Sequence, residues 1–339
     1  MANNTLSLCT LQAWAFYVSV ISMLIDTHCH IHEADFPLGK AETLAAAQAA
    51  DVRKLICVGT NMQSSREAVY FAKKYSCHPE FISGSNNKEA AKSDTKSDWI
   101  PGQARNDALM QIFAAIGVHP HDSKEFSEQD LKDLRDLIRP SFASLSGESS
   151  QTSHMDSPNK LANDKGRVAA IGEIGLDYFY EFSPREKQIR ALEMQMQLAT
   201  DSNLPISFHV RDDHANSGAV WRDFWPILNN FPDIKGALHS FTDTIENLEK
   251  GLNRGLFIGV NGIVTFAKEN ELDMWRAIPL NRMLLETDAP FLSPVPFRGQ
   301  KNQPSFIPKI VEFLSDLRSE TFQEIAKQTT QNAENLFNI

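Results

Sequence analysis

Three of the ten histidines stand at every second position near the N-terminus, in the segment LIDTHCHIHEADF (24–36). Side chains of a β-strand alternate between its two faces, so His28 and His30 should share one face while Cys29 occupies the other. Two neighbouring imidazoles on a buried face need partners, because buried polar groups are nearly always satisfied. The pair taken alone therefore indicates either a binding site or two hydrogen-bonded core histidines. His32 falls beyond the strand, before acidic residues, and we expect it to be solvent-exposed.

Further polar residues close other apolar runs of the chain, namely His119, His121, Glu173, Asp177, His209, Arg211, His239 and Asp288. A lone histidine at a strand end is more often a hydrogen-bonded core residue than a ligand, but that explanation would have to hold on several strands at once. Imidazoles and carboxylates together suit hard or borderline divalent metals. Glu173 is the best candidate to bridge two ions, because a carboxylate has two oxygens.

Several other residues have ordinary structural explanations. His78 and His154 lie in polar segments and His214 lies in a polar loop, so we interpret all three as bystanders. The pair Asp177 and Tyr178 is open to two interpretations: a contact to a ligand or substrate, or the turn that starts a loop.

The elements that must position these groups alternate regularly. Near-continuous apolar runs favour strands that are buried on both faces, as in a parallel sheet. Eight such runs occur, at 24–30, 54–60, 112–120, 168–177, 205–210, 236–241, 256–262 and 283–290, and helical patterns lie between them, among them 41–50, 64–75 and 183–200. The third pattern opens with Ser183, Pro184 and Glu186, which are typical of a helix start. The alternation predicts an α/β fold, a single (β/α)8 barrel, whose active sites lie at the C-terminal ends of the strands.

Three segments do not fit the rhythm. Residues 76–110 and 141–166 are polar and without period, and we interpret both as surface insertions. Residues 1–22 precede Met23 and are patchily apolar without a basic start, so we expect an N-terminal extension outside the fold; an added leader or a weak anchor is the alternative. The barrel domain is then 23–339, and its length without the two insertions is close to the roughly 250 residues of a typical barrel.

Composition narrows the class of partners. The formal net charge of −10 argues against a broad grip on duplex nucleic acid, which depends on many Lys and Arg contacts to phosphates. It leaves room for an anionic substrate if bound metal supplies local positive charge. The four cysteines, Cys9, Cys29, Cys57 and Cys77, form no CxxC spacing, which indicates free thiols in a reducing, cytoplasmic compartment. We interpret Cys29 and Cys57 as small core residues and expect no membrane partner.

Six motifs in order resemble those of one known family. The segments IDTHCHIH, GVHPHD, AIGEIGLDYFY, ISFHVRD, ALHSFT and LLETDAPFLSP with RGQKNQP look like successive motifs of the TatD family of metal-dependent deoxyribonucleases, which are (β/α)8 hydrolases related to the amidohydrolase superfamily. The resemblance spans residues 24–339 apart from the two insertions. One departure is Gln303, where the family often has an acidic residue.

The resemblance implies a role for each ligand. His28 and His30 would help hold one divalent ion, Glu173 would be shared between two ions, and His209 and His239 would hold the other. Asp288 would be a ligand and the general base, so that Asp288 and Glu173 are the catalytic pair. The two ions would be Mg, Mn or Zn.

The implied activity is hydrolysis of phosphodiester bonds in DNA, often as a 3′-to-5′ exonuclease on single strands. Two divalent ions can activate a water molecule and stabilise the departing oxygen, and Asp288 would orient that water. His119, His121 and Arg211 would contact the phosphate, with Arg298 or Lys301 on the adjoining backbone. Arginine suits phosphate because its planar guanidinium donates two parallel hydrogen bonds.

Three alternatives stay open. One is a related hydrolase of cyclic amides or esters, although many such enzymes bridge their metals with a modified lysine and the segment AIGEIGLD offers Glu173 instead. Another is ester hydrolysis on a D-aminoacyl-tRNA by the same pair of metals. The last is a non-catalytic protein whose fold the insertions have damaged.

Overall fold

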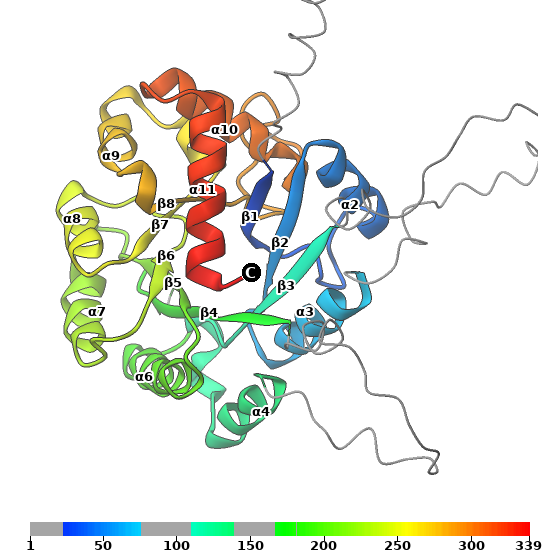
Figure 1. Cartoon of the computed structure of the whole chain (residues 1–339). Coiled ribbons are helices and arrows are strands. Elements are labelled where there is room, and N and C mark those ends of the chain that lie inside the picture. Colours follow the sequence, from blue (N-terminus) through cyan, green and yellow to red (C-terminus); the bar gives the residue numbers. More distant parts are fainter. Residues whose placement is uncertain (1–22, 76–109, 139–166, 181) are drawn as a thin grey trace, which may run out of the picture.

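A closed ring of eight parallel strands forms the centre of the molecule, and helices surround it (Figure 1). The computed structural model describes residues 23–75, 110–138, 167–180 and 182–339. The strands are β1 Leu24–Cys29, β2 Val52–Val58, β3 Gln111–Ile116, β4 Val168–Asp177, β5 Ile206–Arg211, β6 Gly236–Leu238, β7 Phe257–Val260 and β8 Met283–Leu285. Each pairs in parallel with the next along the chain. The predicted (β/α)8 barrel is confirmed.

The helices follow the strands as the alternation predicts. They are α2 Lys40–Ala49, α3 Met62–Tyr75, α4 Glu128–Ile138, α6 Arg185–Ser202, α7 Ala219–Asn229, α8 Ile245–Asn253, α9 Leu272–Ala277, α10 Ile307–Leu317 and α11 Phe322–Phe337. Short 3-10 turns are η3 Pro120–Glu125, η5 Gly262–Phe266, η6 Glu269–Glu271, η7 Leu280–Arg282 and η8 Pro304–Phe306. Among the helices described, none is long and apolar enough to cross a bilayer.

The ring closes between β1 and the segment after β8. The backbone N–H of Asp288 donates to the carbonyl of His28 at 2.8 Å, and the N–H of His30 donates to the carbonyl of Ala289 at 2.8 Å. Cys29 and Ala289 form a parallel bridge at the same place. This closure joins the first predicted motif to the last. His28 and Asp288 are 260 residues apart in the sequence.

The N-terminal end of the barrel is plugged by α11, which lies across the ring of strands in Figure 1. Its Leu336 and Phe337 pack with Ile25 and Ile56 from the barrel interior. A capping box fixes the start of this helix, since the hydroxyl of Thr321 and the N3 carboxylate each bond the other's backbone. With one end of the barrel filled, a site is confined to the C-terminal end.

Strand ends differ from the prediction in two places that matter. The third strand ends at Ile116 and not at residue 120, because Pro120 begins η3 and His119 is its N-cap. The eighth ends at Leu285 and not at residue 290, because Thr287 bonds to the Asp26 carboxylate and Asp288 adopts a φ of 57°. Both differences place predicted site residues on irregular backbone. The direction of each of these side chains therefore depends on local backbone dihedral angles and not on the alternation of a strand.

The helix expected at 183–200 begins two residues later, at Arg185. Pro184 is its N-cap residue and makes no side-chain cap. Ser183 is occupied elsewhere, since its hydroxyl donates to the carbonyl of His121 at 2.6 Å and accepts from the N–H of Lys124 at 3.1 Å. The serine therefore ties the start of α6 to η3.

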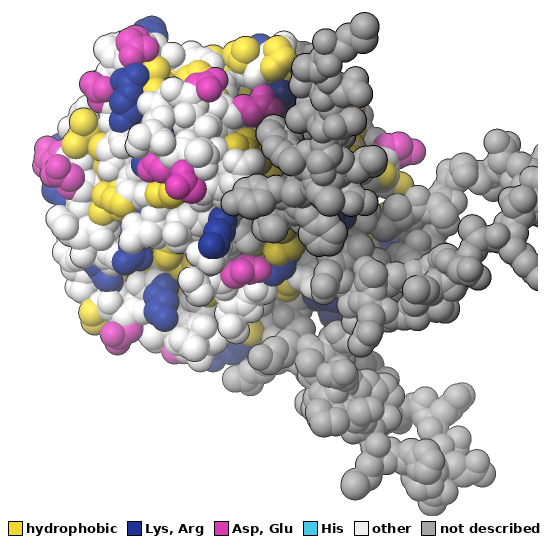
Figure 2. Space-filling model, turned by 45° about the horizontal axis from the view of Figure 1, so that its top comes forward, with side chains coloured by type: hydrophobic (Ala, Val, Ile, Leu, Met, Phe, Trp, Pro, Cys, Tyr) yellow, Lys and Arg dark blue, Asp and Glu magenta, His cyan; other side chains and the backbone are white. Residues whose placement is uncertain are grey.

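The three segments outside the expected fold, 1–22, 76–110 and 141–166, lie outside the described residues apart from Met110. Met110 precedes β3 and is buried in the core. Cys29 and Cys57 are buried free thiols on neighbouring strands, in agreement with their interpretation as core residues. The side of the molecule in Figure 2 mixes acidic and basic side chains, with no histidine visible among its coloured atoms.

Candidate metal centre

The six expected ligands meet at the C-terminal end of the barrel. They are His28 in β1, His30 directly after β1, Glu173 in β4, His209 in β5, His239 directly after β6 and Asp288 after β8. Glu173 was expected at the end of its strand, but it is the sixth residue of β4, which continues to Asp177. It therefore lies within the strand and is buried, with 4% of its surface exposed.

Glu173 is the centre of the group. One carboxylate oxygen, Oε2, lies 3.5 Å from Nε2 of His28. The other, Oε1, lies 2.7 Å from Nδ1 of His209, 3.2 Å from Nε2 of His239 and 3.6 Å from Nε2 of His119. The two oxygens thus face different histidines, as a bridging carboxylate would.

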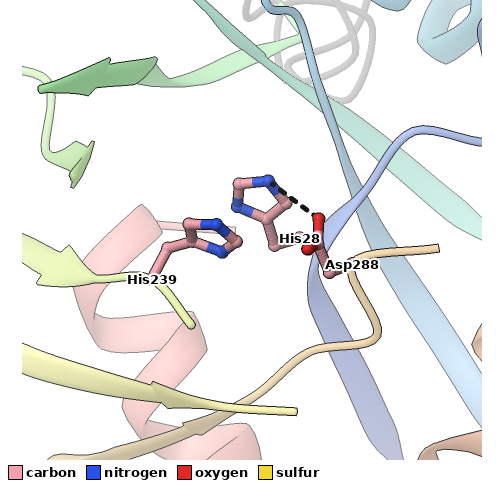
Figure 3. A group of neighbouring side chains, drawn as sticks. All are labelled: His28, His239 and Asp288. Atoms are coloured by element: carbon pink, nitrogen blue, oxygen red, sulfur yellow. Dashed lines mark ion pairs between the residues drawn. The ribbon is translucent and has the colours of Figure 1, made fainter. Parts of the chain in front are cut away.

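The His28 side of the group is shown in Figure 3. The rings of His28 and His239 stack with centroids 3.7 Å apart, and Oδ1 of Asp288 lies 3.8 Å from Nε2 of His28. The same Oδ1 lies 3.4 Å from Nε2 of His30, whose Nε2 is 3.2 Å from that of His28. His28 and His30 therefore share one face, as the strand pattern predicts.

Potential ligand atoms gather in three overlapping groups within the described part of the chain. In each group the atoms lie within 4.8 Å of one another: His28, His239 and Asp288; His28, His30 and Glu173; and His119, Glu173 and His209. The donor set of imidazole nitrogens and carboxylate oxygens suits divalent cations such as Zn and Mn. The residues present therefore fit a metal centre.

Three of the candidate ligand histidines each have an acceptor beside the nitrogen that points away from the centre. Nδ1 of His30 lies 2.7 Å from the carbonyl oxygen of Val58, which can only accept, so Nδ1 carries the proton and Nε2 offers a lone pair. Nε2 of His209 likewise lies 2.8 Å from Oδ2 of Asp177, leaving Nδ1 for the centre. Nδ1 of His239 lies at an ion-pair distance of 3.3 Å from Oε1 of Glu286. Metal-binding histidines are commonly oriented by such acceptors.

His119 is held in the opposite way. Its Nδ1 accepts a hydrogen bond from the backbone N–H of His121 at 3.2 Å, as the side-chain cap of η3. Burial lowers the pKa of His119 well below its ordinary value, so the ring is neutral and its one proton is on Nε2, which faces Glu173. A protonated Nε2 donates a hydrogen bond and cannot ligate a metal. Its tautomer therefore favours a substrate contact for His119 over a place among the ligands.

The charges at the centre are strongly coupled. Burial would raise the pKa of Glu173, but the neighbouring imidazoles of His239 and His119 and the bond from His209 hold it well below its ordinary value. Burial would lower the pKa of His30 and of His209, but the carboxylates beside each ring raise both values to about 9. The buried carboxylates thus favour the protonated forms of His30 and His209.

Two buried carboxylates that support this network were not singled out in the sequence. Oε1 of Glu286 accepts from the N–H of Ser240 at 2.5 Å and faces His239, and the missing side chain of Gly259 leaves room for its carboxylate. Asp26 accepts from the N–H of His28 at 3.2 Å and from the N–H and hydroxyl of Thr287. It therefore links β1 to the segment after β8, where the barrel closes. An acidic residue inside an apolar strand is seldom buried without a partner, and this signal was available in the segments LIDTHC and LLETD.

Replacement of Glu286 by Gln is expected to lower the affinity of the protein for divalent metal by 10- to 100-fold, roughly the effect of losing a carboxylate behind a ligand histidine. The amide retains the size of the side chain but no longer favours a proton on Nδ1 of His239. Metal affinity is measured by competition with a chromophoric chelator. Glu246→Gln, on the surface of α8, serves as the matched control, and equal affinities for both variants and the parent would refute a supporting role.

One expectation about the histidines is wrong. His32 is 2% exposed, not solvated, because the chain turns after β1 and places the ring against α3, where Nε2 lies 3.0 Å from Oγ of Ser64. Burial lowers its pKa to about 3, so the ring is neutral. His214 contacts the ring of Phe179 at a centroid distance of 3.8 Å, and His78 and His154 lie outside the described residues.

The other expected substrate contacts lie around the centre at different depths. His121 reaches the network, since its Nε2 lies 3.1 Å from Oδ2 of Asp177. Asp177 is therefore a supporting residue as well as the start of a turn, its Oδ1 accepting from two backbone N–H groups. Arg211 is exposed, with its guanidinium 4.0 Å from the Phe179 ring centre.

Arg298 and Lys301 lie in the loop after β8. Both are exposed, and the Arg298 guanidinium is stacked 3.7 Å above the ring of Phe266 while it donates to the carbonyl of Ser293 at 2.9 Å. The neighbouring Asn302, which was not predicted, is fully buried and donates to the carbonyls of Thr287 and Phe291. It fixes this loop beside Asp288.

Known proteins are similar to this chain in sequence and in fold. Residues 25–338 match the family described as TatD related DNase. A Bacillus subtilis protein named "Uncharacterized metal-dependent hydrolase YabD" is 29% identical over 94% of this chain and its own full length. The "3'-5' ssDNA/RNA exonuclease TatD" of Erwinia tasmaniensis is 29% identical over 93% of this chain and its own full length. The crystal structure of YJJV, a TatD homologue from Escherichia coli, superposes with a TM-score of 0.65 at 26% identity, over 93% of this chain and 98% of its own.

These matches extend over nearly the whole chain and include every strand that contributes to the centre. They confirm the resemblance seen in the motifs. The Bacillus relative is named a metal-dependent hydrolase and the Erwinia relative an exonuclease, and with the family match they indicate that the chain is a hydrolase that acts on ester bonds. It belongs to the TatD-related DNase family.

Proposed function

We propose that this chain is a two-metal deoxyribonuclease that removes nucleotides from single-stranded DNA in the 3′-to-5′ direction. The family and the printed activity of the Erwinia relative support this proposal. The observation that carries it is the position of Glu173, whose two carboxylate oxygens face different sets of histidines.

This arrangement supports two ion positions. His28, His30 and Asp288 would hold one ion, His209 and His239 would hold the other, and Glu173 would contact both. His239 also lies close to His28 and Asp288, so the two positions are adjacent. When bound, such ions would activate a water molecule and stabilise the charge that develops on phosphate oxygens.

The chain's own groups would position and move protons around the substrate. Burial would raise the pKa of Asp288, but the bond from His30 and the nearby imidazoles lower it, so its carboxylate is ionised and able to accept a proton from water. Nε2–H of His119 would donate to a phosphate oxygen. His121 and Arg211 would contact the same phosphate, and Arg298 and Lys301 would contact the adjoining backbone.

Binding of metal is expected to be stronger at higher pH. His30 and His209 have pKa values of about 9 in the metal-free protein, so both are protonated at pH 7 and must lose their protons to ligate a cation. Affinity for Mn or Zn should rise between pH 6 and pH 8.5, with protons released on binding. Calorimetry in buffers of different ionisation enthalpy measures this release, and an affinity independent of pH would contradict the assignment of these ligands.

The stability of the metal-free protein should follow the opposite trend at high pH. A histidine whose pKa is raised by folding stabilises the fold below its ordinary value of about 6.5, and the contribution is lost as the pH rises through about 9. Metal-free protein should therefore melt at a lower temperature at pH 9.5 than at pH 7.

The function is tested by chelation and re-addition. Chelated protein should not degrade a 3′-labelled or 5′-labelled single-stranded oligodeoxynucleotide, and Mg, Mn or Zn should restore activity that shortens the strand from its 3′ end. A mischarged D-aminoacyl-tRNA is assayed in parallel. Deacylation with no cleavage of DNA would show that the same centre hydrolyses a carboxylic ester and would refute the nuclease proposal.

A further inference from the structure

Exposed aromatic side chains gather around the candidate metal centre. The exposed large hydrophobic residues in the described part of the chain are Tyr70, Tyr180, Phe182, Ile245, Phe266, Phe291 and Val295. Only Tyr70 and Ile245 lie on outer helices, whereas the other five follow β4, β7 or β8. Water-exposed aromatic rings are thus concentrated at the end of the barrel where a substrate would bind.

Two of these rings, Tyr180 and Phe182, are stacked in parallel, and we call this pair the aromatic platform. Their planes differ by 8° and their centroids lie 5.3 Å apart. Tyr180 is 39% exposed and Phe182 is 57% exposed. The spacing leaves no room for a third ring between them, so a ligand would stack on an outer face.

The platform is fixed to the catalytic network. Oδ1 of Asp177 accepts from the N–H of Tyr180 at 3.0 Å, while Oδ2 of the same carboxylate lies 2.8 Å from His209. The ring of His121 lies edge-on to both platform rings, at centroid distances of 5.3 Å and 4.9 Å. The Asp177 carboxylate therefore links the platform to the proposed ligand His209. A group that stacks on the platform would be part of the same substrate that the metal centre cleaves.

A cation lies beside the platform. The guanidinium of Arg211 is 5.0 Å from the ring centre of Tyr180 and is exposed. Proteins that bind single-stranded nucleic acid combine basic groups, which follow the phosphates, with aromatic rings, on which the bases stack. Only an unpaired base presents a free face, because a base within a duplex is covered by its neighbours.

We propose that the outer face of Phe182, whose other face is stacked on Tyr180, packs against an unpaired nucleobase near the 3′ end of the substrate strand, while Arg211 contacts a phosphate of the same strand. This inference rests on the proposed nuclease function and extends it, since it explains a preference for single strands by named residues.

The test compares two substrates that differ only in their bases. One is a single-stranded oligodeoxynucleotide, and the other has the same backbone with abasic residues at its three 3′-terminal positions. Base–aromatic stacking is worth about 1–3 kcal/mol, so the wild-type enzyme should prefer the complete strand by about tenfold in kcat/KM, mainly through KM.

Three variants distinguish the effect of a flat aromatic ring from the effects of side-chain size and apolar area. Phe182→Leu remains apolar but lacks the flat face, and it should lose most of the preference. Phe182→Tyr retains the ring and should keep the preference. Tyr70→Leu removes a ring that is 66% exposed on α3, away from the centre, and should behave as the wild type. Because both positions are exposed, equal melting temperatures are expected and are measured first.

The outcomes distinguish the two proposals. Cleavage of both substrates with equal kcat/KM by the wild type would overturn the platform and leave the nuclease function standing. An unchanged preference in Phe182→Leu would overturn it as well and would leave the exposed rings as a surface for another protein. Failure of the wild-type, metal-loaded protein to cleave either strand would overturn the nuclease proposal and the platform with it.

Discussion

Glu173→Gln should lower hydrolytic activity by about 10³-fold. The substitution removes the negative charge that lies between the histidines and replaces one oxygen by an NH2 group, which cannot bind a cation. Stabilisation of phosphate charge by metal is worth several kcal/mol, and about 4 kcal/mol corresponds to a factor of 10³ in rate. Because Oε1 and Oε2 face different histidines, the amide cannot serve both positions at once.

The measurement is kcat/KM with saturating metal, together with the metal content of the purified variant. Glu193→Gln on the exposed side of α6 is the matched control. The variant should also contain less metal than the parent. Metal-dependent activity close to that of the parent would contradict the bridging role of Glu173.

Asp288→Asn should reduce kcat by 10²- to 10⁴-fold, which is the usual contribution of a general base. The carboxylate is 16% exposed, faces His30 at 3.4 Å and has a lowered pKa, so it is ionised and accessible to water near neutral pH. An amide cannot accept the proton of an attacking water. KM should change much less than kcat, because the proposed phosphate contacts of His119, His121 and Arg211 are left in place.

Asp233→Asn, an exposed substitution away from the centre, is the matched control for this variant. Its kcat should equal that of the parent. If Asp288→Asn raised KM and left kcat unchanged, Asp288 would be a binding residue and another group would have to accept the proton.

The barrel and the set of residues at its mouth were predictable because both depend on simple periodicities. Eight apolar runs that alternate with helical patterns leave few folds other than a (β/α)8 barrel, and in that fold the ends of all strands meet. A polar residue at the end of a run is thus close to the others even when it is distant in sequence, as His28 and Asp288 are.

What could not be predicted depends on irregular backbone. His32 is buried because the chain turns back onto α3, and no periodicity describes that turn. The tautomer of His119 depends on a single backbone N–H presented by η3. The position of Glu286 behind His239 depends on the register between β7 and β8 and on the absent side chain of Gly259. Such details set the role of each histidine, although they leave the fold class unchanged.

Two cations are proposed to lie on either side of Glu173, and anomalous diffraction from crystals soaked in Mn²⁺ would locate them. We expect two anomalous peaks, one in contact with His28, His30 and Asp288, the other in contact with His209 and His239, and both in contact with the Glu173 carboxylate. A single peak that lacks Glu173 as a ligand, or peaks only at other acidic groups, would contradict this proposal.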